Sequence, residues 1–301
     1  MEFAAFIITY RRPLILKNTI NLLFSQTITP HKILIIDNDP EESSKYLIES
    51  YSDKEITYFS VGINSGPAGG AFWGLKTLFD EGWEWVLWVD DDDAPSSSTQ
   101  IETIFSILRS YPNPENVGMI GASGVLYNYN SCTINRIPDS QLNGILEVDM
   151  IAGNQFPIVH RRVYESGVLP DPNLFFGFED LEFNLRVKKL GFSILVKGEE
   201  VERLRKNFNK YGKEKLRALK KNKNNLWREY YSIRTIMYIL RNNKDNFAAL
   251  KYSYKNIIKI IYNFRFGFNY GLINSYYIFK GVIDGYRRKM GLSVLPQKKY
   301  I

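Results

Sequence analysis

The sequence predicts an α/β protein in which helices cover both faces of a mostly parallel sheet. Short apolar runs alternate with segments of helical periodicity over the first 130 residues, which is the pattern of repeated strand–helix units. Apolar residues make up 45% of the 301 residues, so the chain can bury a sizeable core. Polar loops with aspartate and glycine follow the apolar runs, at the edge where parallel sheets bind ligands.

The individual elements are predicted from their apolar patterns. Continuous apolar runs predict strands at 3–9, 32–37, 56–59, 85–89 and 117–121. Helical periodicity predicts helices at about 13–25, 42–51, 67–81 and 97–110, and Pro13 suits the first turn of the first one. Short strands are expected in residues 122–200, with helices at about 161–167 and 179–190. From 207 onward the pattern is helical.

The charges divide the chain into two regions. Residues 201–301 contain 24 Lys and Arg against 5 Asp and Glu, a net charge of +19, whereas residues 1–200 carry a net charge of −12. Such a split indicates that the two parts have different partners. We therefore expect a sheet domain over residues 1–205 and a basic, amphipathic helical extension over residues 206–301.

Composition argues against several kinds of protein. The single cysteine, Cys132, excludes an intrachain disulfide, and the two histidines lie too far apart in sequence to indicate a histidine-rich zinc site. The first residues lack the features of a signal peptide, and no run of eighteen apolar residues predicts a membrane span. No zinc-finger, RNA-recognition or helix-turn-helix signature is present, so no nucleic-acid partner is expected.

Four adjacent aspartates, Asp90 to Asp93, directly follow an apolar strand. Adjacent carboxylates repel one another, and a bound cation removes that repulsion. Hard divalent cations take carboxylate oxygens and keep positions free for phosphate oxygens. The run therefore predicts a metal site at the strand end. The alternative is a solvated acidic loop in which Asp93 or Ser96 caps the next helix.

The loop at 64–70 precedes the third predicted helix and contains three glycines, Gly66, Gly69 and Gly70. Glycines allow a ligand to approach the backbone closely. The N–H groups at the start of the helix can then face an anion. The alternative interpretation is an ordinary turn from a strand into a helix.

Two adjacent acids, Glu179 and Asp180, open a predicted helix after an aromatic, glycine-containing turn. Acids at a helix start interact favourably with the helix dipole, so one interpretation is structural. A carboxylate in aromatic surroundings can also serve as a general base, which is the second interpretation.

Taken in order, these segments resemble the inverting glycosyltransferases of family 2, which have the GT-A fold. The matching segments are 8–12, 36–38, 64–70, 88–95 and 176–183, together with Arg186. The rhamnosyl- and galactofuranosyltransferases, which build bacterial surface polysaccharides, are the most similar branches. The resemblance covers roughly residues 3–205, and it implies a GT-A, Rossmann-like catalytic domain there.

The resemblance implies a role for individual residues and a cofactor, Mn²⁺ or Mg²⁺. Residues expected to bind the nucleotide-sugar donor, a UDP- or dTDP-sugar, are Thr9, Arg11, Asp37, Asn64, Gly66, Asp91 and Asp92. Asp91 and Asp93 are expected to bind the metal, because Ala94-Pro95 follows them as in the family; a register shifted by one residue, starting at Asp90, is the alternative. Asp180 is the expected catalytic base, with Glu179 beside it.

One position departs from the family pattern. Many relatives carry a metal-binding histidine some twenty residues after the acidic pair, and Arg203 stands near that place in this chain. A planar guanidinium can neutralise phosphate charge without a metal. Arg203 is therefore expected to contact the donor diphosphate or to fill the place of the missing histidine.

The implied reaction is transfer of a sugar, with inversion, to a hydroxyl of a glycan or lipid-linked acceptor. Two alternatives stay open. A sugar nucleotidyltransferase would carry a Gly-rich, Lys-containing loop after the first strand, where this chain has Thr9-Tyr10-Arg11-Arg12-Pro13. A degenerate glycosyltransferase domain acting as an assembly partner is weakly favoured by Arg203 and opposed by the complete aspartate run.

The basic extension contains an amphipathic helical segment over residues 247–264. Its apolar face is formed by Phe247, Leu250, Tyr254, Ile257, Ile258 and Ile261, and Lys251, Lys255 and Lys259 repeat beside it. This pattern predicts a helix at an anionic membrane surface, with the lysines toward lipid phosphates. The protein is then expected in the cytoplasm, peripheral on the inner face of the cell membrane. The alternative is that the helices pack on the catalytic domain or form a homo-oligomer.

Overall fold

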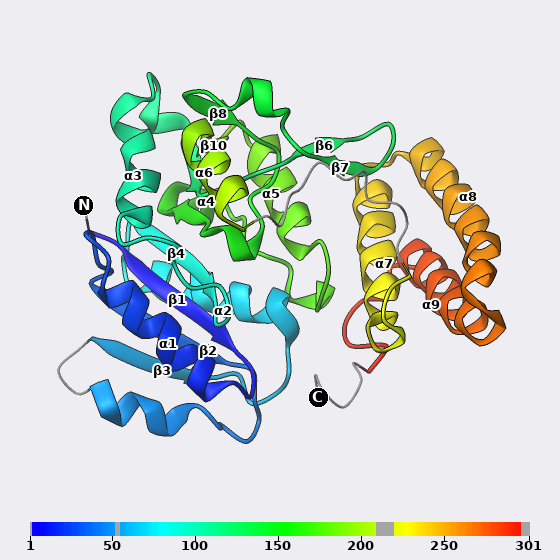
Figure 1. Ribbon diagram of the computed structural model, residues 1–301, viewed down its shortest axis with the longest axis horizontal. Helices are drawn as coiled ribbons and strands as arrows, with labels where there is room; N and C mark the ends of the chain where they lie inside the picture. The colour runs from blue at the N-terminus through cyan, green and yellow to red at the C-terminus, as the bar shows by residue number, and fades with distance from the viewer. Residues whose placement is uncertain (1, 52–54, 209–219, 296–301) are drawn as a thin grey trace.

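The computed structural model describes residues 2–51, 55–208 and 220–295, in which a central sheet lies beside a group of C-terminal helices (Figure 1). The eight strands of the sheet have the order β3-β2-β1-β4-β9-β5-β10-β8. In chain order they are β1 (Ala4–Thr9), β2 (Lys32–Asp37), β3 (Ile56–Ser60), β4 (Trp85–Asp90), β5 (Val117–Gly121), β8 (Ile145–Glu147), β9 (Ile158–His160) and β10 (Ser193–Lys197). Only β8 and β9 run antiparallel to their neighbours within this sheet, so the predicted α/β, mostly parallel sheet is confirmed.

Helices cover both faces of the sheet because its strands are apolar on both sides. In β1, Ala4 and Phe6 point into the core on one face, and Ala5 and Ile7 point into the core on the other. The first core lies under α2 (Gly66–Asp80), α4 (Arg161–Glu165) and α5 (Glu179–Lys189), and the second under α1 (Pro13–Phe24) and α3 (Gln100–Ser110).

Two predicted helices differ from the observed ones. The segment predicted as a helix at 42–51 forms only the 3₁₀ helix η1 (Lys45–Tyr51). The helix predicted from 97 begins at Gln100, because the preceding turn is bonded to the loop between α1 and β2. There, Gln26 Nε2 donates to the carbonyl of Ser97 (2.8 Å), and the N–H of Thr27 donates to the carbonyl of Ser98 (2.8 Å).

The described part of the C-terminal region is mostly helical, as predicted, whereas residues 209–219 and 296–301 lie outside the described residues. After α6 (Gly198–Phe208) come α7 (Trp227–Asn242), α8 (Asn246–Asn263) and α9 (Phe268–Tyr286), and the expected domain boundary at 205/206 falls within α6. A hairpin of β6 (Leu126–Asn128) and β7 (Thr133–Asn135) extends from the sheet region toward α8 (Figure 1). Among the described helices, none combines the length and hydropathy that a membrane span requires.

Three lysines that repeat along α8, Lys251, Lys255 and Lys259, are partly or largely exposed to solvent but also contact other parts of the chain. The first two donate to carbonyls in the turn of the β6–β7 hairpin, those of Asn130 (3.1 Å) and Ser131 (3.5 Å). The third pairs with Glu229 on α7 (2.5 Å). Periodicity places the lysines on one stripe of the helix, and the hairpin and α7 supply acceptors along that stripe.

Glu229 is a buried carboxylate that connects α7 to α8 and to the segment before α7. Its side chain is 5% exposed and accepts hydrogen bonds from Lys221 and Lys259. Burial raises the pKa of Glu229, but the two ammonium groups outweigh that effect, so its pKa lies below the ordinary value. The interaction therefore stabilises the fold above the pKa of the unfolded chain, and this stabilisation is lost as pH falls through the folded pKa.

We expect Glu229→Gln to lower the free energy of unfolding at neutral pH by about 2 kcal/mol, since it removes a buried carboxylate that accepts charge-assisted hydrogen bonds from two partly exposed lysines. Urea unfolding of wild type and variant measures the difference, which shrinks as the pH is lowered through the folded pKa of Glu229. Glu202→Gln is the matched control, because Glu202 is 48% exposed and pairs with Lys206 on one helix. Its expected effect is below about 1 kcal/mol. Equal effects of the two substitutions would contradict the role given to Glu229.

Candidate active site

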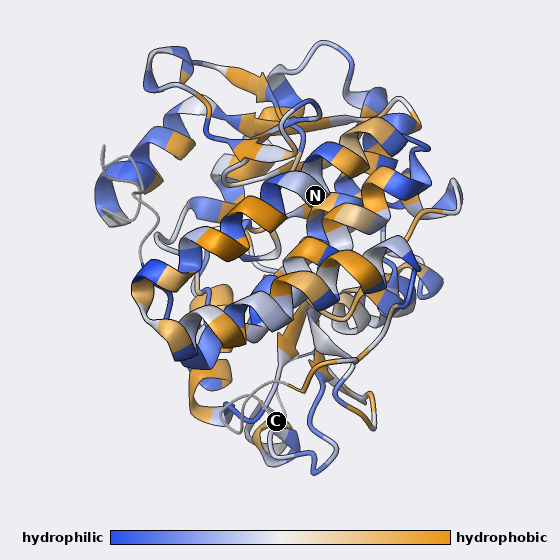
Figure 2. Ribbon diagram, turned by 90° about the vertical axis from the view of Figure 1, so that its right-hand side faces the viewer, coloured by the Kyte–Doolittle hydropathy of each residue, from blue (hydrophilic) through white to orange (hydrophobic). Residues whose placement is uncertain are grey.

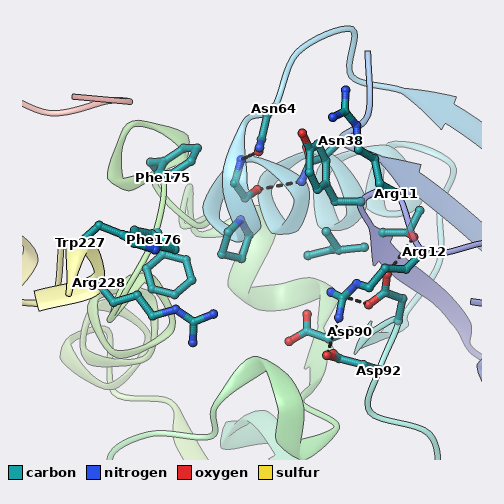
Figure 3. A pocket seen from close by; sticks show the side chains of 16 residues that line it. Arg11, Arg12, Asn38, Asn64, Asp90, Asp92, Phe175, Phe176, Trp227 and Arg228 are labelled. Carbon is teal, nitrogen blue, oxygen red and sulfur yellow. Dashed lines mark hydrogen bonds and ion pairs between the residues drawn. The ribbon is translucent and has the colours of Figure 1, made fainter. Parts of the chain in front are cut away.

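The carboxyl ends of β1, β2 and β4 lie side by side and open into one cavity. Strand register pairs Thr9 with Asp37 and Ile8 with Asp90, so the loops predicted to carry the chemistry meet at this edge. The cavity has a volume of about 480 Å³, within the range of small-molecule sites (Figure 3). Its lining residues are Ile8, Thr9, Tyr10, Arg11, Arg12, Asn38, Asn64, Gly66, Pro67, Asp90, Asp91, Asp92, Phe175, Phe176, Trp227 and Arg228.

Three of the four adjacent aspartates line this cavity, and they differ in their surroundings. Asp91 is fully buried, where its carboxylate accepts from Thr9 Oγ1 (2.8 Å) and pairs with Arg12 (2.8 Å). Asp90 is half-buried at the end of β4 and accepts a long hydrogen bond from Trp88 Nε1 (3.4 Å). Burial and the neighbouring carboxylates raise the pKa of Asp90 to about 7. Burial also raises the pKa of Asp91, to about 6.

Asp93 lies outside the lining of this cavity. It lines a neighbouring cavity of about 180 Å³ together with Asp92 and Ser96. If the metal-binding pair is shifted by one residue, its members are Asp90 and Asp92, and both line the larger cavity. Thr9, expected to contact the donor, lines the cavity and also fixes the carboxylate of Asp91.

Arg12 is a site residue that the sequence pattern did not single out. Its guanidinium pairs with Asp91 (2.8 Å) and with Asp92 (2.5 Å), and Figure 3 shows it directed across the cavity. The neighbouring Arg11, an expected donor ligand, also lines the cavity and pairs with Asp39 (3.0 Å). The signal for Arg12 was its place directly after the first strand, where all loops of a parallel sheet converge.

The carboxylates of Asp90 and Asp92 fit a divalent cation. They are hard oxygen ligands, and a cation bound between them would favour the charged form of Asp90, whose pKa is raised by burial and by the neighbouring carboxylates. Within residues 2–51, 55–208 and 220–295, no three His, Cys, Asp or Glu side chains converge in a way that would hold a metal by themselves. A cation here would therefore take part of its ligands from water or a bound phosphate, as Mg²⁺ commonly does.

The glycine loop forms the adjoining wall of the cavity. Asn64 Oδ1 accepts from the N–H of Gly66 (3.1 Å), and Asn38 Nδ2 donates to the Gly66 carbonyl (3.0 Å). Gly66 has a positive φ of 69°, and a Cβ atom there would lie 2.1 Å from the carbonyl oxygen of Phe175. Position 66 therefore requires glycine both for its backbone conformation and for the close approach of the loop before α5.

We expect Gly66→Ala to lower thermal stability and to weaken nucleotide binding, because the new methyl group displaces either the Phe175 carbonyl or the start of α2. Gly62→Ala is the matched control: Gly62 also has a positive φ, of 76°, but no atom lies within 4 Å of its Cβ position. The difference in melting temperature between the two variants isolates the contact with Phe175. Equal melting temperatures would show that only the strained φ matters.

The expected catalytic acids, Glu179 and Asp180, begin α5 just beyond the aromatic residues that line the cavity. Glu179 is buried, and burial together with the charges of Asp180 and Asp90 raises its pKa well above the ordinary value. Asp180 is half-buried, and its Oδ1 accepts from the N–H of Leu181 (2.8 Å). Burial raises the pKa of Asp180 to about 6. Neither acid belongs to the lining of the cavity itself.

The wall opposite the aspartates is aromatic and combines two distant parts of the chain. Phe175 and Phe176 come from the loop before α5, whereas Trp227 and Arg228 come from the start of α7. The ring of Phe176 packs on Trp227 (centroids 4.9 Å apart), and the guanidinium of Arg228 lies over the ring of Phe176 (5.3 Å). Figure 3 shows Arg228 and Arg12 entering the cavity from opposite sides.

Three consecutive carbonyls of this aromatic loop bind three separate segments. The carbonyl of Asn173 accepts from Gly291 N (2.6 Å), and that of Phe175 accepts from Ala68 N (3.3 Å). The carbonyl of Leu174 accepts from Arg234 (2.7 Å), whose side chain is fully buried on α7. The loop is thereby attached to α2, to α7 and to the segment after α9.

Two expected donor ligands lie outside the cavity lining. Asp37 is buried, and its carboxylate accepts from Tyr58 Oη (2.8 Å) and from the N–H of Asp39 (2.8 Å), so it organises the loop after β2. Arg203, on α6, pairs with Glu200 (2.7 Å) and donates to Ser96 Oγ (2.9 Å). The arginine that faces the cavity from the C-terminal part is Arg228.

The N-terminal part of the chain matches a known protein family. Residues 4–123 match the family model described as Glycosyl transferase family 2. Galactofuranosyltransferase GlfT1 of Mycolicibacterium smegmatis is 27% identical over 107 residues, which are 36% of this chain and 35% of that protein. GlfT1 of Mycobacterium tuberculosis is 29% identical over 109 residues, 36% of each chain. The matched stretch is thus about a third of the length of these curated relatives.

Solved structures extend the likeness to the whole fold. The mannosyltransferase PcManGT from Pyrobaculum calidifontis, solved in complex with GDP-Man and Mn²⁺, has a TM-score of 0.55 to this chain at 10% identity. The alignment covers 96% of this chain and 88% of that one. At this identity the likeness concerns the fold, which is the GT-A glycosyltransferase fold.

Proposed function

Residues 4–123 form a glycosyl transferase family 2 domain within a GT-A fold, and from this premise we propose that the protein transfers a sugar from a nucleoside diphosphate donor to an acceptor hydroxyl. The observation that carries the proposal is one cavity in which carboxylates and guanidinium groups face the same space. Asp90 and Asp92 supply the carboxylates, and Arg12 and Arg228 supply the positive charges. This combination suits a diphosphate bound together with a divalent cation.

The nucleotide is assigned to the end of the cavity nearest β1, β2 and the glycine loop. Tyr10, Asn38 and Asn64 give this end an aromatic ring and amide groups, which suit a base and a ribose. Thr9 and Gly66 remain part of this wall as positioning residues. The donor diphosphate then lies between Arg12 and Arg228, since guanidinium groups form paired hydrogen bonds with phosphate oxygens.

A divalent metal, Mn²⁺ or Mg²⁺, is assigned to Asp90 and Asp92. When bound, the metal would neutralise the negative charge that develops on the leaving diphosphate. Asp91 is given a different role from the one expected, because its carboxylate already holds Thr9 and Arg12. It fixes the loop that presents its two neighbours.

Asp180 is assigned as the general base, with Glu179 as its neutral neighbour. The acceptor hydroxyl attacks the anomeric carbon while the bond from that carbon to the diphosphate oxygen breaks, and Asp180 takes the hydroxyl proton. A single displacement of this kind inverts the anomeric centre. The aromatic wall of Phe176 and Trp227 suits the apolar face of a sugar, and the acceptor class is a glycan or lipid-linked hydroxyl.

The test is a donor screen with purified protein. UDP-, dTDP- and GDP-sugars are incubated with Mn²⁺, with Mg²⁺ or with a chelator, and nucleoside diphosphate release is measured with and without candidate acceptors. Release of nucleoside diphosphate that requires the metal is the expected result. Release of pyrophosphate from a sugar phosphate and a nucleoside triphosphate would instead identify a nucleotidyltransferase. Absence of both binding and release across the panel would favour a degenerate assembly partner.

A further inference from the structure

The outward face of α8 is apolar and lies uncovered in the structure. Phe247 is 79% exposed, Leu250 is 70% exposed and Ile261 is 71% exposed, and they recur at helical spacing. Tyr254, Ile257, Ile258 and Tyr262 are also exposed and belong to the same helix. A contiguous exposed apolar surface of this kind marks a binding site for another surface.

The second half of this surface belongs to α9. The exposed apolar residues there are Phe268, Leu272, Ile273, Tyr276, Phe279 and Tyr286. Figure 2 views the molecule from the side of α8 and α9, and hydrophobic segments lie along both helices on this side. At 1.5 Å per residue, α8 and α9 are each about 27 Å long, so the two helices form a broad apolar platform.

Most of the charges around this platform are positive. Asp284 is the only acid within α8 and α9, and it is buried, where it accepts from Tyr230 Oη and pairs with Lys280. Arg265, at the corner between the helices, stacks on Tyr262 (3.8 Å) and Phe266 (4.5 Å). Further exposed cations follow α9 at Arg287, Arg288 and Lys289. The platform thus exposes apolar and aromatic side chains beside cations, and the exposed carboxylate at its edge, that of Asp245, caps α8 by accepting from the N–H of Ala248 (2.8 Å).

We infer that α8 and α9 dock flat onto an anionic lipid surface, with their exposed apolar side chains among the acyl chains. Interfacial helices combine one apolar face, aromatic residues at the boundary and basic residues toward lipid headgroups. A symmetric dimer through the same face would bring like charges together, because a two-fold interface pairs each patch with its own copy. The inference rests on this surface alone and does not depend on the proposed sugar transfer.

The structure also changes which residues carry the attachment. Lys259 pairs with Glu229, and Lys251 and Lys255 donate to carbonyls of the β6–β7 turn, so part of their charge is directed toward the protein. Binding to the lipid surface then depends mainly on the apolar side chains of the platform. Arg265 and the cations after α9 add the electrostatic attraction to lipid headgroups. Raised salt is expected to weaken binding to anionic vesicles without abolishing it.

Vesicle flotation of the full chain tests the inference. Wild type is expected to float with vesicles of phosphatidylcholine and phosphatidylglycerol, and to bind vesicles of phosphatidylcholine alone at least tenfold more weakly. The triple variant Leu250→Ser/Ile257→Ser/Ile261→Ser is expected to remain at the bottom of the gradient. The matched control is Leu14→Ser/Tyr46→Ser/Leu190→Ser, which removes three exposed apolar side chains from the catalytic region and should float like wild type.

Circular dichroism and sedimentation of each variant accompany the flotation. Wild type that stays at the bottom with both kinds of vesicle would overturn the inference, and so would equal flotation of wild type and the α8 variant. A wild-type dimer that the α8 variant dissociates, without vesicle binding, would show that a second copy covers this face. An inactive protein that still floats would contradict only the proposed transfer reaction.

Discussion

Asp90→Asn is expected to lower the rate of sugar transfer by about 10²-fold or more and to remove most of its dependence on Mn²⁺ or Mg²⁺. The substitution keeps the shape of the side chain but removes one of the two carboxylates assigned to the metal. A metal contributes several kcal/mol to charge stabilisation, and each 1.4 kcal/mol corresponds to about tenfold in rate. Transfer rates at a series of metal concentrations, with calorimetry of nucleoside diphosphate binding, measure the effect.

Asp93→Asn is the matched control for Asp90→Asn. Asp93 belongs to the same aspartate run but lines the neighbouring cavity. We expect its substitution to leave the metal dependence of transfer close to that of wild type. If Asp93→Asn instead abolishes metal-dependent binding while Asp90→Asn does not, the metal register is the one beginning at Asp91.

Asp180→Asn is expected to reduce transfer by about 10²–10⁴-fold while nucleotide binding stays near that of wild type, which is the usual effect of removing a general base. Burial raises the pKa of Asp180 to about 6. Because the base must be ionised to take the proton, wild-type transfer should fall as pH drops below about 6, and the variant should lose this limb of the profile. Initial rates across the acid range, at saturating donor, measure both effects.

Glu179→Gln separates the two acids of the pair. Burial and nearby negative charge raise the pKa of Glu179 well above its ordinary value, so the neutral amide resembles its state at neutral pH. We expect this variant to retain most of the transfer rate and to keep the acid limb near that of wild type, since Glu179 is already neutral in the pH range where Asp180 titrates. A loss as large as that of Asp180→Asn would identify Glu179 as the base.

The strand ends that form the site could be predicted because each one depends on a short stretch of sequence. An apolar run followed by aspartates predicts both the strand and its exit point, and parallel topology brings such exits to one edge. For this reason Thr9, Asn64 and Asp92 line one cavity although they are distant in sequence. Whether the side chain at a strand end faces the cavity or the neighbouring loop depends on tertiary packing. The sequence pattern therefore could not predict that Asp37 is buried.

The other side of the site depends on tertiary packing that local patterns do not encode. Trp227 and Arg228 have the pattern of any amphipathic helix start, and only the packing of α7 against the aromatic loop turns them toward the cavity. The stretch matched by the family model ends at residue 123 and therefore does not include them. Arg203 was selected by its sequence distance from the acidic pair, but a helical contact with Glu200 fixes its guanidinium elsewhere.

Through the loop at 173–176, the C-terminal helices help to determine the shape of the cavity. The three carbonyls of this loop fasten α2, α7 and the segment after α9 to a single point. A movement of α7 would therefore reach the glycine turn and the aromatic wall together. Evolution of a new acceptor preference by exchange of the C-terminal helices would have to preserve Arg234 and the partners of these carbonyls. An exchange of the C-terminal helices is therefore expected to change the shape of the cavity as well.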